Sequence, residues 1–91
     1  MLVALIETTR HDDHLLIVNV AVAPAQQKRG FGRRLLAHAE LLAREAALGT
    51  VRLYTNARMV ENIALYQSLG YRIDREEPMG TSVQVHMSKA L

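Results

Sequence analysis

The sequence predicts an α/β domain, a mixed α+β sheet that carries two helices in the order β-β-α-β-α-β-β. Three observations support this fold class. Runs of β-branched and aliphatic residues open and close the chain, apolar residues recur at helical spacing between them, and a glycine follows each helical stretch. Because a chain of 91 residues builds one hydrophobic core, we expect a single domain over residues 1–91.

Two strands open the predicted sheet. Leu2 to Thr8 and Leu15 to Val22 are rich in strand-forming residues, and the polar stretch Thr9 to His14 between them is typical of a hairpin loop. The second strand alternates only weakly between apolar and polar residues, which indicates burial on both faces. It is therefore predicted to be a central strand.

The first helix has the clearest periodicity. It is predicted from Phe31 to Leu48, and Gly49 stands where a left-handed C-terminal stop is expected. A short strand follows from Val51 to Thr55, and Asn56 is a suitable N-cap for a second helix that ends before Gly70.

The end of the chain predicts a hairpin. Tyr71 to Glu77 and Ser82 to Lys89 are strand-like, and Pro78-Met79-Gly80 between them is a turn signal. The ring of Tyr71 is expected to fold back over the last turn of the second helix.

The composition narrows the class of protein. Without cysteine, the chain has no disulfide, thiolate metal site or cysteine nucleophile. No window approaches the roughly 20 apolar residues of a membrane span, so we expect a cytoplasmic protein and no membrane partner. The net charge is only +2, and the one Phe and three Tyr are not interleaved with basic residues, so we expect no nucleic-acid partner. His11 and His14 lie in a polar loop that is typical of solvated surface, and we expect no metal.

The turn that precedes the first helix has unusual chemistry. Helix N-termini favour acidic side chains, because their free backbone N–H groups and the helix dipole present positive charge there. This turn instead holds four cations and no acid: Lys28, Arg29, Arg33 and Arg34. A bound phosphate would relieve the repulsion, and Gly30 and Gly32 would let it approach the backbone N–H groups. The pattern predicts a pyrophosphate site from Gln27 to Gly32.

Other interpretations of this turn were weighed. A solvated turn with surface charges is the plainest. A Walker loop is excluded because Arg33-Arg34 stands where the Lys-Ser/Thr pair belongs, and a dinucleotide fingerprint lacks its third small residue at Arg34 or Leu35.

Two motifs resemble the GNAT superfamily of N-acetyltransferases. Gln27-Lys28-Arg29-Gly30-Phe31-Gly32 matches the family pattern Gln/Arg-x-x-Gly-x-Gly/Ala, and Val20-Ala21-Val22-Ala23-Pro24 before it resembles the family's strand ending in Val-x-Pro. The segment from Asn62 to Tyr71 resembles a later family helix in which a tyrosine precedes a Leu-Gly-Phe/Tyr ending. The resemblance covers Leu2 to Leu91.

The resemblance implies acetyl-CoA as cosubstrate. The backbone of Gln27 to Gly32 would hold the pyrophosphate, with Arg33 and Arg34 as nearby charge. The pantetheine arm would lie between parallel strands that splay apart, along Val20, Ala21 and Val22, and the N–H of Val22 would bind the thioester carbonyl. Asn62 or Asn56 is implied as a further contact of the arm.

The resemblance also implies a catalytic residue. A neutral primary amine would attack the thioester directly, and Tyr66 would protonate the departing sulfur; the alternative is that Tyr66 only packs the helix on the sheet. Glu7 is a candidate base, with a solvent-facing edge glutamate as the alternative. His86 in the last strand could approach the acceptor, although its sequence neighbours give no support.

The chain departs from the family at its start. Relatives begin with a strand, two helices and another strand, which form much of the acceptor pocket. We therefore expect an uncovered sheet edge and apolar face, and hence a homodimer or a chain that lacks its natural start. The predicted function is acetyl-CoA-dependent N-acetyl transfer to an unidentified amine. The alternatives are a catalytically incomplete CoA-binding module and a structural domain without ligand.

Overall fold

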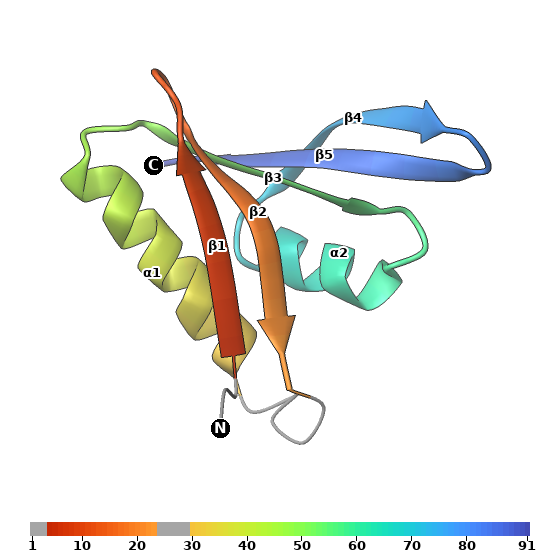
Figure 1. Ribbon diagram of the computed structural model, residues 1–91, viewed down its shortest axis with the longest axis horizontal. Helices are drawn as coiled ribbons and strands as arrows, with labels where there is room; N and C mark the ends of the chain where they lie inside the picture. The colour runs from red at the N-terminus through yellow and green to blue at the C-terminus, as the bar shows by residue number, and fades with distance from the viewer. Residues whose placement is uncertain (1–3, 24–29) are drawn as a thin grey trace.

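The computed structural model describes residues 4–23 and 30–91, which form a five-stranded sheet with two helices on one face (Figure 1). The strands and helices, in chain order, are β1 (Ala4–Arg10), β2 (Leu15–Val22), α1 (Phe31–Glu45), β3 (Thr50–Asn56), α2 (Val60–Ser68), β4 (Arg72–Met79) and β5 (Ser82–Ala90). This order confirms the predicted α/β fold class and the sequence of elements.

The strands lie in the order β1-β2-β3-β5-β4, and all neighbouring pairs are antiparallel except β2 with β3. β2 is an interior strand, as predicted, but its burial is one-sided. Leu15 and Ile17 are buried against the helices, whereas Leu16 and Val18 on the other face are only half-buried. The weak alternation of β2 therefore reflects apolar residues on a face that the described helices do not cover.

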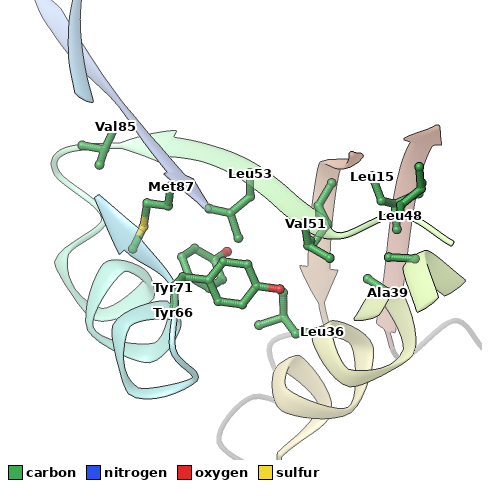
Figure 2. Packing of buried hydrophobic residues seen from close by; sticks show 12 residues of the cluster. Leu15, Leu36, Ala39, Leu48, Val51, Leu53, Tyr66, Tyr71, Val85 and Met87 are labelled. Atoms are coloured by element: carbon green, nitrogen blue, oxygen red, sulfur yellow. The ribbon is translucent and has the colours of Figure 1, made fainter. Parts of the chain in front are cut away.

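The core lies between α1 and the sheet. Leu36, Ala39 and Ala43 of α1 are fully buried and pack with strand residues such as Val51 and Leu53 (Figure 2). The central strands supply β-branched and aliphatic residues to this layer because alternate side chains of a strand point to the same face.

The first helix ends earlier than predicted. Ala47, with φ 59°, takes the left-handed conformation expected of Gly49. The N–H of Leu48 donates to the carbonyl of Ala43 at 2.8 Å, and the N–H of Ala47 donates to Arg44 at 3.0 Å, which is a Schellman ending. Leu48 then turns into the core, where its burial offsets the strain at Ala47.

The second helix begins later than predicted. Asn56 is the last residue of β3, and its Oδ1 accepts a hydrogen bond from the N–H of Arg58 at 2.8 Å, so it forms a turn and does not cap the helix. The far end of α2 agrees with prediction. Gly70 is left-handed, with φ 97°, and the Tyr71 ring packs edge-on against Tyr66.

The final turn is shorter than predicted. Pro78 and Met79 belong to β4, and the chain reverses at Gly80, where φ is 64°. A proline is tolerated there because β4 is an edge strand, whose outward N–H groups need no ladder partner.

Met87 provides a test of the core. We expect Met87→Ala, at a site with 1% exposure, to lower the free energy of unfolding by about 2–5 kcal/mol, because it leaves a cavity between β5 and the helices. The matched control is Met79→Ala on exposed β4, which should change it by less than about 1 kcal/mol. Urea denaturation measures both. Equal losses would show that Met87 does not hold the core together.

Candidate active site

The site lies where β2 and β3 separate. Their parallel pairing covers only three residue pairs and ends at Ile17 and Leu53, after which the two strands diverge (Figure 1). The pairing of β1 with β2 shifts register at the same level, from Thr8 opposite Ile17 to Glu7 opposite Asn19, with Val18 between them. This β-bulge bends β2 away from β3. The backbone of β2 beyond Ile17 therefore has no ladder partner in β3.

A cavity of about 830 Å³ opens beside this separation. Its walls come from β2, from the first turns of α1 and from the start of α2. The lining residues are Val20, Ala21, Gly30, Phe31, Gly32, Arg33, Leu36, Arg58, Met59, Val60, Glu61, Asn62, Leu65 and Tyr66. A cavity of this size is within the usual range for a cofactor or other small molecule.

The N-terminus of α1 forms the charged end of the cavity. Gly30 precedes the helix in a left-handed conformation, and among the described residues no side chain caps this end and no acid lies in the first turn. The first helical hydrogen bond runs from the N–H of Arg34 to the carbonyl of Gly30 at 3.1 Å, which leaves the N–H groups of Phe31, Gly32 and Arg33 outside the helical pattern. Together with the Arg33 side chain, they make a suitable site for an anion.

Tyr66 also lines the cavity. It lies on α2 with 8% exposure, and its ring meets that of Tyr71 edge-on at a centroid distance of 6.2 Å. Burial raises the pKa of Tyr66 above the ordinary value of a phenol. The hydroxyl therefore stays protonated at neutral pH.

Glu40, Lys89 and Tyr71 form an ionic cluster next to Tyr66, in contact with it through the Tyr71 ring. Nζ of Lys89 donates to Glu40 at 2.9 Å and lies 5.9 Å from the centre of the Tyr71 ring. The Tyr71 hydroxyl donates to the other oxygen of Glu40 at 3.4 Å. Burial, helped by the Glu40 carboxylate, raises the pKa of Tyr71. This cluster joins α1 to β5 and to the chain that leaves α2.

The cavity contains many of the residues that the sequence predicted for the cofactor. Val20, Ala21, Gly30 to Arg33 and Asn62 line it together with Tyr66. Asn56 lines a separate hollow of about 330 Å³ near the β4–β5 turn. Gln27, Lys28 and Arg29 lie outside the described residues.

Two further predicted residues are Val22 and Glu7. Val22 is the last residue of β2, and its backbone is opposite Ala4. Glu7 lies on β1, exposed and away from the cavity lining, with its Oε1 3.4 Å from Nδ2 of Asn19.

Sequence reasoning missed several residues of the site. Arg58 and Met59 line the cavity because the connection from β3 to α2 crosses its mouth. Glu40 was missed as well, although an acid between Leu36 and Ala43 on the buried stripe of α1 was a usable signal.

Neither a metal site nor a membrane segment appears in the part of the chain that the structure describes. No cluster of three or more potential ligands is found there, and neither helix is long and apolar enough to cross a bilayer. The histidines of the first loop stack on each other, and His14 pairs with Asp13 at 2.6 Å.

The sequence matches the family model described as the acetyltransferase (GNAT) domain over residues 2–73. The chain belongs to the GNAT acetyltransferase family. This membership agrees with the two motifs, and the structure places parts of both beside one cavity.

Three known proteins are similar to this GNAT chain in sequence or in fold. It is 37% identical to an uncharacterized N-acetyltransferase of Bacillus subtilis (strain 168), YvbK, over 57 residues, which are 63% of this chain and 37% of that protein. It is 28% identical to the ribosomal-protein-S18-alanine N-acetyltransferase of Escherichia coli, with a TM-score of 0.86 and coverage of 97% and 61%. A GNAT family acetyltransferase of Elizabethkingia anophelis, solved with acetyl-CoA bound, shares the fold at 20% identity, a TM-score of 0.86 and coverage of 100% and 70%. The chain thus spans well under half of the B. subtilis protein and about three fifths of the E. coli enzyme.

The buried tyrosines predict a loss of stability at alkaline pH. In the unfolded chain a tyrosine ionises near its ordinary pKa of about 10, whereas the raised pKa of Tyr71 keeps it protonated in the folded state. The unfolded state then binds fewer protons, so the free energy of unfolding should fall above about pH 10, by up to about 1.4 kcal/mol per pH unit for this residue. Urea denaturation between pH 8 and 11 measures the slope, and Tyr71→Phe should reduce it. An unchanged slope would contradict the assignment to Tyr71.

Proposed function

We propose that this chain is an acetyl-CoA-dependent N-acetyltransferase domain. The observation that carries the proposal is one cavity whose lining includes both the uncapped, arginine-flanked N-terminus of α1 and the buried Tyr66. An anion site and a proton donor are what the pyrophosphate and the leaving sulfur of acetyl-CoA need. The acetyl-CoA bound to the E. anophelis relative supports the same cosubstrate.

In this proposal the cofactor lies along the cavity from α1 to β2. The pyrophosphate binds the turn from Gln27 to Gly32, and the last residues of this turn are the first residues of α1. Arg33 and Arg34 supply positive charge beside it. The pantetheine arm lies beside Val20 and Ala21, where β2 has no β3 partner, and Asn62 contacts it from α2. The N–H of Val22 binds the thioester carbonyl as charge develops on its oxygen.

The proposed reaction moves the acetyl group directly to a primary amine. The ammonium form of the acceptor loses one proton, and the neutral nitrogen attacks the carbonyl carbon. The C–N bond forms, the C–S bond breaks, and Tyr66 protonates the sulfur. The proton then lost by the new amide nitrogen restores Tyr66, so one proton is released overall. The sequence suggests Glu7 as the group that accepts the first proton, the one lost by the ammonium form of the amine.

A CoA-binding module without turnover is the second candidate function. It is favoured by the position of Glu7, which lies outside the cavity lining and already contacts Asn19. The homodimer and the cytoplasmic location expected from the sequence are also proposals.

A charge reversal at Gly32 tests the binding site. Gly32→Glu should weaken CoA binding by more than about tenfold, because its carboxylate would lie beside the pyrophosphate in a partly enclosed site. The matched control is Gly32→Gln, which adds similar bulk without charge; a Cβ at this position meets only Cδ2 of Leu65 at 3.4 Å. Calorimetric titration of CoA measures both variants. Equal binding by the wild type and by both variants would place the pyrophosphate elsewhere.

Removal of the Tyr66 hydroxyl tests the chemistry. Tyr66→Phe should lower kcat for thiol release by about 100-fold or more, because a general acid is lost, while affinity for acetyl-CoA stays within about twofold. Thiol release is followed with a panel of polyamines, aminoglycosides and peptides with free N-termini, and affinity by calorimetry. If the wild type binds acetyl-CoA but releases thiol with none of the amines, the chain is a binding module.

A further inference from the structure

Three polar side chains gather on the sheet face opposite the helices. Tyr54 alternates with the buried Leu53 on β3, and His86 lies between the buried Val85 and Met87 on β5, so both point away from the core. The two residues are opposite each other in the β3–β5 ladder, and their rings are 6.2 Å apart. Glu77 on β4 completes the group.

Glu77 holds the imidazole of His86. Its Oε1 is 3.1 Å from Nε2 of His86, and the side chains are 40% and 25% exposed. Two cations lie nearby. Arg75 is opposite His86 in the β4–β5 ladder and 3.7 Å from the second oxygen of Glu77, and Arg52 on β3 is opposite Ser88, two residues along β5 on the same face. With a proton on Nε2 donated to the carboxylate, Nδ1 is left as a proton acceptor.

The group lies beside the point where the sheet opens. Tyr54 directly follows Leu53, the last residue of β3 that pairs with β2. Across the opening, Asn19 follows the β-bulge and is exposed next to Val20, which packs on the core. Tyr54 and Asn19 therefore flank the opening on the face away from the cofactor cavity.

This arrangement separates the two reactants. In the proposed function acetyl-CoA occupies the helix side, so an incoming amine has free access to the thioester only from the other face. The amine then arrives between Asn19 and Tyr54, with His86 one strand further on. One water molecule, or the Tyr54 hydroxyl, can carry a proton from the amine nitrogen to His86.

We propose that His86, oriented by Glu77, accepts the proton that the acceptor amine loses before it attacks acetyl-CoA. The proposal rests on the proposed acetyl transfer and names its base. The ammonium nitrogen gives its proton to the intervening water or to the Tyr54 hydroxyl, which passes one of its own protons to Nδ1 of His86. The carrier thus loses one O–H bond and gains another, and the partly exposed imidazole then releases the proton to solvent.

Glu7 is the competing base. It lies on β1, one strand from the opening on the opposite side, and its carboxylate already accepts a hydrogen bond from Asn19. Histidine is the commonest general base in enzymes, which favours His86. The two candidates are separable by mutation.

The test compares pH–rate profiles of the 91-residue chain. Acetyl-CoA and the amine of the panel that gives the fastest thiol release are used between pH 5.5 and 9. His86→Gln should lower kcat/KM by about 100-fold and remove the acidic limb of the profile, since the general base is lost. Glu77→Gln should move that limb and lower the rate less. Acetyl-CoA affinity, measured by calorimetry, should stay unchanged in both.

One control variant and one variant of the competing base make the result decisive. The control, His38→Gln on the exposed surface of α1, should keep the wild-type profile. Glu7→Gln removes the competing base and should leave the acidic limb in place. The inference is overturned if His86→Gln and Glu77→Gln both retain the wild-type profile, or if Glu7→Gln removes the limb, and the proposed transfer stands in either case. Absence of thiol release from the wild type overturns the transfer itself and this inference with it.

Discussion

The short parallel ladder between β2 and β3 is the constraint on which the rest of the structure depends. Three residue pairs join the strands, and the β-bulge at Val18 turns β2 aside where they end. A longer ladder would satisfy the backbone of β2 and close the sheet. Because it stops at Ile17 and Leu53, β2 leaves the ladder beside the cavity on the helix side, and Tyr54 follows the last pair on the other face.

The electrostatics of α1 suit this opening. Near its middle the helix is held by Glu40, whose buried carboxylate pairs with Lys89 and accepts from Tyr71. The pair is partly buried, with the Lys89 side chain 27% exposed, and together with the Tyr71 hydroxyl it ties α1 to β5. Its N-terminus keeps three N–H groups outside the helical pattern, flanked by Arg33. A firmly held helix thus presents an anion site at the cavity.

The order of the elements was predictable because each depends on neighbours in the chain. Apolar spacing indicated α1, and Gly70 marked the end of α2 through its need for a positive φ. The errors arose where tertiary contacts prevailed over local signals. Burial of Leu48 forced Ala47 into the left-handed position expected of Gly49, and pairing with β5 kept Asn56 and Pro78 in strands.

The sequence by itself determined the family, the order of elements and the basic, acid-free character of the turn before α1, because these depend on residues within a few positions of each other. Only the tertiary structure decided where β2 and β3 separate, that burial raises the pKa of Tyr66, and which partners hold Glu40 and His86. Glu40 and Lys89 are 49 residues apart, and Glu77 and His86 lie on different strands. Such pairs depend on strand order and register, which local sequence does not specify.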